Sequence, residues 1–189
     1  MTRVLGICGS LRSGSYNRAL LEAARELVPD GMTVEIFGRT GEIPLYDADL
    51  ENDERRPEPV RELKREIAEA DGVLISSPEY NHGISGVLKN AIDWASRPGH
   101  KSPFVGKPVA IMGVSPGAGG TAHAQIQLRE ALYSTLAHVM PHPGVLVGTA
   151  KEKFTDGELT DERTRDFVAK FLAQFAEYVE RLSEEPAPA

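Results

Sequence analysis

Apolar residues along the chain form two kinds of segment. Short runs with few polar residues lie at 4–8, 33–37, 72–76 and 109–114, and a fifth, interrupted by prolines, lies near 139 and at 144–147. Longer segments with apolar residues at helical spacing lie at 19–27, 60–70, 85–95, 121–137 and 161–182. The short runs are typical of strands buried on both faces, and the longer segments are typical of amphipathic helices.

Strand and helix alternate five times, which predicts a parallel sheet with helices on both faces. Of the doubly wound folds, the flavodoxin-like sheet of order 2-1-3-4-5 suits a chain of 189 residues best. We expect a single domain at 1–183 and a flexible tail at 184–189. Ligands of such sheets bind beyond the carboxyl ends of the strands, so the loops after strands one, three and four should meet there.

The turn that follows the first strand has residues suited to a phosphate group. Gly9 and Gly14 allow tight or left-handed turns, and the start of the next helix offers unpaired N–H groups and a positive dipole end. Side-chain donors come from Ser10, Arg12, Ser15 and Asn17. A Walker A loop would need Lys and then Ser or Thr after Gly14, and no Gly-x-Gly-x-x-Gly is present. The turn therefore indicates a monophosphate site, or else a simple connecting loop.

The loops after strands three and four have features that suit a flat, polar ring. Pro78, Glu79, Tyr80 and Asn81 follow strand three, and Ser115 with several glycines follows strand four. Tyr80 offers an aromatic face, although packing alone would also explain it. Glu79 could equally be a surface carboxylate or a charge at the start of the next helix. A phosphate site and a ring site at one sheet edge together describe flavin mononucleotide (FMN).

Composition excludes several classes of protein. The net charge of −7 argues against a nucleic-acid binder, and no run is long enough to span a bilayer. Cys8 is the only cysteine, which fits a reducing cytoplasm, and we expect it to be a small core residue. The five histidines show no metal-ligand spacing, and the carboxylates at 47–54 suggest a solvated acidic loop. We therefore predict no metal site, although His82 could lie near a flavin or a partner subunit.

Two long motifs carry a resemblance to a known family. Residues 9–17 (GSLRSGSYN) and 78–94 (PEYNHGISGVLKNAIDW) resemble the NADPH-dependent FMN reductase family, in particular its chromate- and quinone-reducing branch. The similarity covers nearly the whole chain, including IPLYD at 43–47. Two places depart from the family pattern: the loop at 113–120 is rich in glycine, and His82 replaces an aromatic residue. These departures affect the expected nicotinamide and acceptor pocket rather than the flavin site.

The resemblance implies a role for each of these residues. The FMN phosphate would be held by Ser10, Arg12, Ser15 and Asn17, and Tyr16 would contribute mainly backbone. The ribityl chain and the ring would be lined by Pro78, Glu79, Tyr80 and Asn81. Ser115 would close the site.

The implied activity is an FMN-dependent NAD(P)H oxidoreductase with ping-pong kinetics and no catalytic side chain. Hydride would pass from NADPH or NADH through FMN to quinones, chromate, azo compounds or nitro compounds. We expect a cytoplasmic homodimer or homotetramer whose partners are small-molecule acceptors, not nucleic acid or membrane. The main alternative is a flavodoxin-like electron carrier that docks onto proteins. A phosphoryl-transfer enzyme would also use the Gly9 turn, but the lysine it needs is absent.

Overall fold

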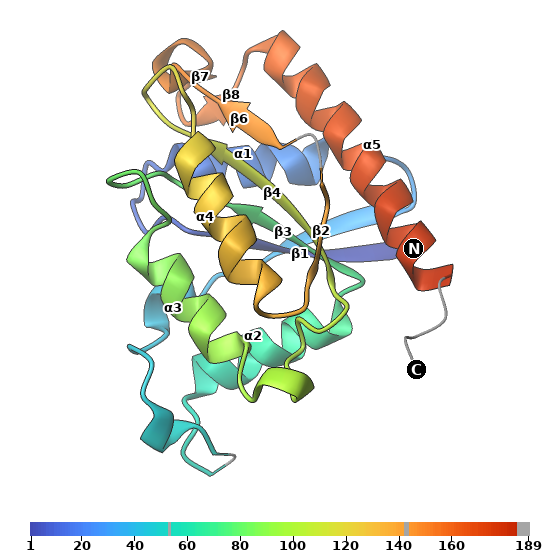
Figure 1. The fold of residues 1–189 in the computed structure, drawn as a ribbon. Coiled ribbons are helices and arrows are strands. Elements are labelled where there is room, and N and C mark those ends of the chain that lie inside the picture. The colour runs from blue at the N-terminus through green and yellow to red at the C-terminus, as the bar shows by residue number, and fades with distance from the viewer. Residues whose placement is uncertain (53, 142–143, 185–189) are drawn as a thin grey trace.

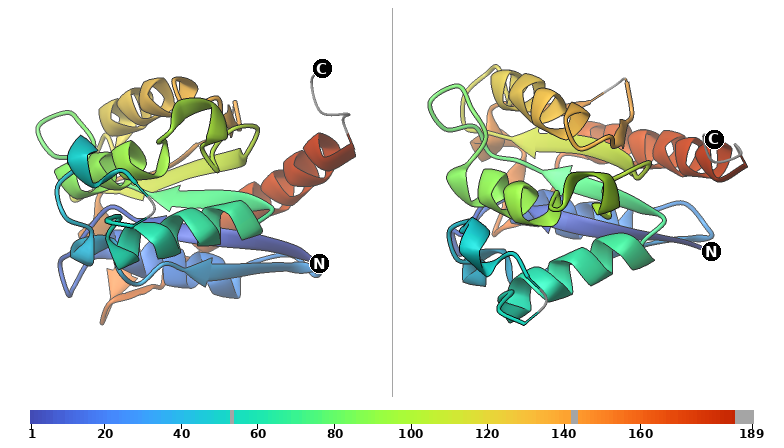
Figure 2. Two further views of the ribbon diagram at one scale, coloured as in Figure 1. Left: turned by 90° about the horizontal axis from the view of Figure 1, so that it is seen from below. Right: turned by 60° about the horizontal axis from the view of Figure 1, so that its bottom comes forward.

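The computed structural model describes residues 1–184, apart from 53, 142 and 143. Its main sheet lies between two layers of helices (Figures 1 and 2). The strands are β1 (Thr2–Cys8), β2 (Met32–Ile36), β3 (Gly72–Ser76), β4 (Pro108–Val114), β5 (His138–Val139) and β6 (Val145–Val147). All pairings in this sheet are parallel, and the order β2-β1-β3-β4-β5 confirms the predicted flavodoxin-like arrangement.

The fifth strand position is divided into two short pieces. β5 pairs with the start of β4 at Pro108 and Val109, and β6 pairs with its end at 112–114. Pro141, which lies between the two pieces, has no N–H to donate to a ladder. The predicted interruption is therefore real, although Pro143 lies outside the described residues.

Among the described residues, five α-helices cover the two faces of the sheet. They are α1 (Tyr16–Glu26), α2 (Glu58–Glu69), α3 (Gly86–Ala95), α4 (Ala122–Tyr133) and α5 (Glu162–Glu184). One core cluster joins α1 and α5 to the sheet, and a second joins α2, α3 and α4 to its other face. Within the described residues, no helix is both long enough and apolar enough to cross a membrane.

Three details of the helices differ from the predictions. α4 ends at Tyr133 rather than 137, because the chain turns there and Leu136 takes a left-handed conformation with φ of 62°. α5 includes Glu184, so it extends into the predicted tail, and 185–189 lie outside the described residues. Phe167 is one of the apolar residues in the predicted helical pattern at 161–182, but it is 43% exposed, since Val168 occupies the buried position.

The long connection at 38–57 is held against α3. It contains two short 3-10 turns, Thr40–Glu42 and Ala48–Leu50. Trp94 is fully buried and donates its indole N–H to the Pro44 carbonyl at 2.8 Å. Asn90 donates to the same carbonyl and accepts from the Tyr46 N–H, each at 2.8 Å. Trp94 is therefore a core residue that positions this loop.

A small antiparallel hairpin between β6 and α5 was not predicted. Its strands are β7 (Phe154–Thr155) and β8 (Glu158–Leu159). Strands of two residues are too short to produce a recognisable alternation. Phe154 packs against Tyr16, with ring centroids 5.2 Å apart, so the hairpin lies beside the first turn of α1.

Candidate functional site

The carboxyl ends of β1, β3 and β4 meet at one edge of the sheet, as predicted. The Gly9 N–H donates to the Ser76 carbonyl at 2.9 Å, which joins the first loop to β3. The Ser77 N–H donates to the Met112 carbonyl at 3.0 Å, which joins the second loop to β4. Ser85, the N-cap of α3, donates its hydroxyl to the Gly9 carbonyl at 2.6 Å. These bonds fix the loops relative to one another.

The turn after β1 offers a row of free backbone donors. Ser15 is the N-cap of α1, and its hydroxyl accepts from the Arg18 N–H at 3.3 Å. In the part of the chain that the structure describes, the N–H groups from Ser10 to Asn17 donate to no protein acceptor. Arg12 is exposed, and its guanidinium lies 5.3 Å from the centre of the Tyr16 ring. Free N–H groups at a helix start beside a cation suit an anion.

The side chain of Asn17 is committed to the protein itself. Its amide donates to the Val114 carbonyl at 2.9 Å, and its oxygen accepts from the Val114 N–H and the Ser76 hydroxyl, both at 3.1 Å. Asn17 was expected to help hold the phosphate, and in the structure one of its two amide N–H groups donates to the Val114 carbonyl. Asn17 therefore helps to build the site, and its backbone N–H and its second amide N–H have no protein acceptor among the described residues.

The two glycines of the turn have different roles from those expected. Neither Gly9 nor Gly14 has a positive φ, so neither provides a left-handed turn. A Cβ on Gly9 would lie 3.0 Å from Pro78 Cδ and 3.1 Å from Leu88 Cδ2. A Cβ on Gly14 would meet nothing within 4 Å. Gly9 is required for close packing of the first loop on the second, and Gly14 is not.

The loop after β3 reverses direction in a tight hairpin. Tyr80 and Gly83 exchange two backbone hydrogen bonds of 3.0 Å. Between them, Asn81 and His82 are both left-handed, with φ of 51° and 61°. This pair of positive φ values is the pattern of a type I′ reversal. Pro78 is buried, and Tyr80 is 54% exposed.

Glu79 joins the second loop to the helix after the third. Its Oε2 accepts from the Ala124 N–H at 3.0 Å, in the first turn of α4. The carboxylate therefore satisfies a free donor at the positive end of α4, rather than at the helix that follows it in sequence. Only 16% of the side chain is exposed. Glu79 is therefore a partly buried residue that anchors the loop after β3 to the start of α4.

Ser115 closes its own loop after β4. Its hydroxyl donates to the Gly120 carbonyl at 2.6 Å, and its N–H donates to the Val147 carbonyl at 3.0 Å. Gly120 has φ of 61° and leaves no room for a Cβ against the backbone of Leu146 and Val147. The loop that bears Ser115 is thus held by the Ser115 hydroxyl and by a backbone bond to β6.

A surface hollow of about 540 Å³ adjoins the turn after β1. It is lined by residues 12–16, by the exposed side of α1 and by the β7–β8 hairpin with Arg165. Among the described residues, its lining includes none of Pro78 to Asn81. The hollow therefore lies on the outer side of the turn, toward α1.

Cys8 is buried at the end of β1, as expected. Its Sγ lies 3.5 Å from the Ser10 carbonyl, and burial raises the pKa of the thiol. A thiol that is both buried and protonated is not a nucleophile.

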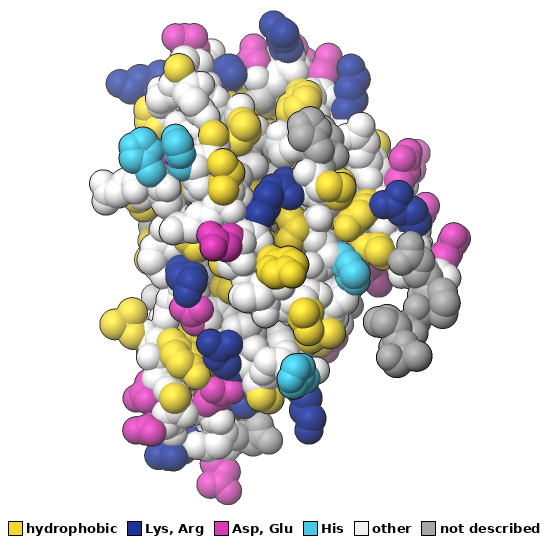
Figure 3. All heavy atoms as spheres, in the orientation of Figure 1, with side chains coloured by type: hydrophobic (Ala, Val, Ile, Leu, Met, Phe, Trp, Pro, Cys, Tyr) yellow, Lys and Arg dark blue, Asp and Glu magenta, His cyan; other side chains and the backbone are white. Residues whose placement is uncertain are grey.

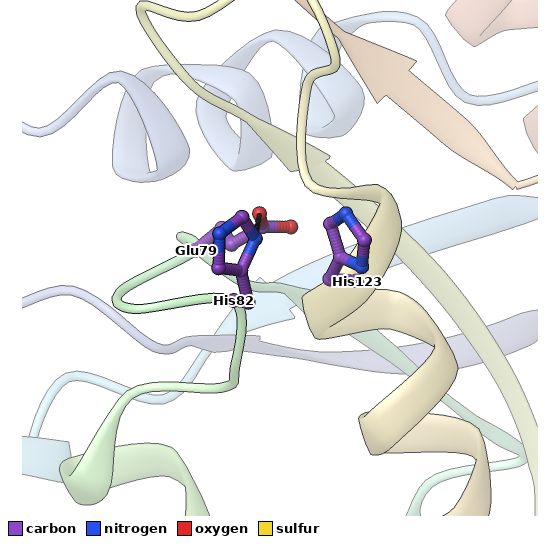
Figure 4. Close-up of side chains that lie close together, drawn as sticks. All are labelled: Glu79, His82 and His123. Atoms are coloured by element: carbon purple, nitrogen blue, oxygen red, sulfur yellow. Dashed lines mark ion pairs between the residues drawn. The ribbon is translucent and has the colours of Figure 1, made fainter.

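Two contacts at this edge could not be predicted from the sequence, although His82 itself was expected near a flavin or a partner subunit. His82 and His123 lie together, with ring centroids 4.7 Å apart, and Glu79 lies beside them (Figure 4). Figure 3 shows histidine side chains side by side on this face of the molecule. Gln127 of α4 accepts from the Ile84 N–H at 2.7 Å. Linear spacing gave no signal for these contacts, because they join the loop after β3 to α4 across the sheet edge.

Comparisons with known proteins agree with this geometry. Residues 2–152 match the family described as NADPH-dependent FMN reductase. The chain is 45% identical over 181 residues to an NAD(P)H-dependent FMN reductase of Pseudomonas aeruginosa, which covers 95% of this chain and 96% of that one. It is 39% identical over 182 residues to a quinone reductase of Escherichia coli, with 95% and 96% covered. Among solved structures, the NAD(P)H:(acceptor) oxidoreductase FerB of Paracoccus denitrificans superposes with a TM-score of 0.86 at 36% identity, with 96% of this chain and 98% of that one covered.

Proposed function

The chain belongs to the NADPH-dependent FMN reductase family, and from this premise we propose that it is a quinone reductase that uses NAD(P)H and bound FMN. One observation carries this proposal. The turn after β1, whose N–H groups have no protein acceptor, meets the loops after β3 and β4 at one edge of the sheet. The electron-carrier alternative is not favoured, because the most similar relatives cited above are named as reductases.

The residues present fit the phosphate of FMN. The N–H groups from Ser10 to Asn17 have no protein acceptor, and Arg12 is exposed beside them. We propose that these N–H groups, with Ser10 and Arg12, hold the phosphate. Tyr16 would contribute through its backbone N–H, and the Ser15 hydroxyl, which accepts from the Arg18 N–H, still has its own hydrogen to donate to the phosphate.

The second and third loops fit a planar ring. We propose that Pro78, Glu79, Tyr80 and Asn81 line the ribityl chain and the ring, and that Ser115 borders the site. The hairpin holds Tyr80 with much of its ring exposed, so an aromatic face is available. The Glu79 carboxylate is fixed by Ala124, so it has little freedom to rearrange when a ligand enters.

When bound, FMN supplies the redox chemistry, since it can accept a hydride and pass two electrons to an acceptor. The chain supplies binding and orientation. No side chain at the edge forms a nucleophile–base pair among the described residues, so we assign no catalytic residue. Because NAD(P)H and the quinone need the same open face, they should bind in turn.

Three further features belong to the same proposal. Chromate, azo compounds and nitro compounds are further proposed acceptors for the same open face.

We propose a homodimer or homotetramer, which is supported by the exposed apolar Ile126 and Tyr133 on α4. The single cysteine supports a reducing cytoplasm. Light scattering of the purified protein tests the oligomeric state.

The activity is tested with protein purified in the presence of FMN. Anaerobic mixing with NADPH or NADH should bleach the flavin absorbance, and benzoquinone should restore it. Initial rates at several fixed quinone concentrations should give parallel double-reciprocal lines, as ping-pong kinetics require. A yellow protein that NAD(P)H does not bleach would favour the electron carrier, and a colourless protein would overturn the flavin site.

A further inference from the structure

Three metal-ligating side chains converge at the surface between the β3 loop and α4. They are Glu79 and His82 from the loop and His123 from the first turn of the helix (Figure 4). One ligand atom from each lies within 4.8 Å of the other two. His82 Nδ1 is 3.7 Å from Glu79 Oε1. Glu79 is also proposed to line the flavin site, but the proposed flavin chemistry requires neither histidine.

From this grouping we propose that Glu79, His82 and His123 form a binding site for a divalent transition-metal ion such as Zn²⁺, Ni²⁺ or Cu²⁺. Two imidazoles and one carboxylate are a donor set that suits these ions. Mg²⁺ and Ca²⁺ prefer oxygen donors and should compete poorly. The inference depends on the placement of these residues and not on the proposed reductase activity.

The distances are close to those of a bound site. With metal–ligand bonds of about 2.0–2.1 Å, tetrahedral ligand atoms stand about 3.4 Å apart. The present spread of up to 4.8 Å therefore has to close by little more than an ångström. The His82 side chain is 79% exposed and His123 is exposed, so rotation of the rings can provide this movement.

The carboxylate is already oriented for the role. Glu79 Oε2 is held by the Ala124 N–H at 3.0 Å, and Oε1 is the oxygen that faces His82. Partners of this kind fix the direction of metal ligands. The positive end of α4 would repel a cation, and the Glu79 carboxylate offsets that charge because it lies at the same helix end.

The backbone also commits His82 to this position. Asn81 and His82 form the left-handed pair of the hairpin, which Tyr80 and Gly83 close with two hydrogen bonds. Three protein ligands would leave at least one coordination position for water or a small anion. A bound metal would thus join the hairpin to α4 at the rim of the proposed ring site.

The test is equilibrium dialysis of the FMN-loaded protein against Zn²⁺ with excess Mg²⁺, followed by metal analysis. We expect one zinc per chain. His82→Ala and His123→Ala should each weaken the affinity at least about tenfold, since even indirect partners of metal ligands are worth that much. His100→Ala, at an exposed histidine remote from the cluster, is the matched control and should bind zinc as the unmodified protein does.

Two results would overturn the proposal. One is the absence of stoichiometric zinc in the unmodified protein, and the other is unchanged affinity in both histidine variants. Flavin absorbance and melting temperature, measured on each variant, show whether the protein is folded and loaded. A yellow protein without zinc would overturn only the metal site, whereas a colourless protein with zinc would overturn only the flavin proposal.

Discussion

Asn17 and Val114, 97 residues apart, exchange two hydrogen bonds through the Asn17 carboxamide and the Val114 backbone. The carboxamide thus occupies the place of a neighbouring strand at the end of β4. It also accepts from the Ser76 hydroxyl, so one side chain ties α1 to the ends of β3 and β4. This bond network gives the carboxamide at position 17 a structural role.

Replacing Asn17 should therefore destabilise the fold. Asn17→Ala leaves the buried Val114 N–H and carbonyl unpaired, and one such group costs about 1–3 kcal/mol. Asn17→Asp has nearly the same shape but cannot donate to the carbonyl, so it should be as damaging. The free energy of unfolding from urea titration measures both, with exposed Gln174→Ala as the control. Full stability of Asn17→Asp would contradict this explanation.

Arg12 should contribute to FMN affinity through the phosphate. A charge-assisted hydrogen bond is worth about 1.5–3 kcal/mol, so Arg12→Ala should weaken FMN binding roughly tenfold to hundredfold. Riboflavin lacks the phosphate, so its affinity should be unchanged in the same variant. Fluorescence titration of the flavin measures both ligands. Arg181→Ala near the end of α5 is the matched control, and an equal loss for riboflavin would assign Arg12 to the ring instead.

Gly9 and Gly14 should respond differently to alanine. Gly9→Ala forces Pro78 and Leu88 to move, and overpacking of this kind costs about 1–3 kcal/mol. Gly14→Ala meets open space without a positive φ, so its effect should stay within about 0.5 kcal/mol. Urea titration of the two variants provides the comparison. Equal losses would show that backbone freedom, rather than contact, decides both positions.

Asp161 should make stability depend on acid pH. Hydrogen bonds from the Thr164 hydroxyl and N–H lower its pKa below the ordinary 3.8. Because the pKa is lower in the folded state, the stabilisation is complete above the ordinary value and is lost as pH falls through the folded value. Asp161→Asn keeps a capping oxygen but cannot ionise. Its stability should resemble that of the unmodified protein at about pH 7 and fall less toward about pH 3.

Denaturant titrations across this pH range measure the difference between the two proteins. Asp156→Asn, in the exposed turn before β8, is the control. Parallel pH profiles for Asp161→Asn and the unmodified protein would remove Asp161 from the acid response.

Cys8 should resist alkylation in the folded protein. Burial keeps the thiol away from reagents and raises its pKa, so the thiolate is scarce near neutral pH. Iodoacetamide should label Cys8 slowly in buffer and rapidly in urea, as followed by intact mass. Rapid labelling of the folded protein would show that the end of β1 opens readily.

The order of elements could be predicted because it depends on local pattern. Gly72–Ser76 reads as a buried strand from its own residues, and the alternation with helices then dictates a parallel sheet. The three loops at the carboxyl edge followed from topology. Their proposed ligand contacts are still predictions.

Side-chain partners across the edge could not be predicted. The bonds from Asn17 to Val114 and from Glu79 to Ala124 depend on how loops distant in sequence are oriented. The pairing of His82 with His123 depends on the hairpin in which Asn81 and His82 are left-handed. The residue pair Asn-His does not by itself predict that conformation. Such contacts belong to tertiary packing, about which local periodicity carries no information.

Trp94, on α3, is the chain's single tryptophan. It is buried against the connection at 38–57, and its ring centroid lies 5.0 Å from that of Tyr46. The molecule thus contains one tryptophan emitter, which is buried and donates its indole N–H to the Pro44 carbonyl. A red shift of its emission would report specifically that this loop has detached from α3. Release of the 38–57 connection from α3 can then be followed by the protein's own fluorescence, without an attached dye.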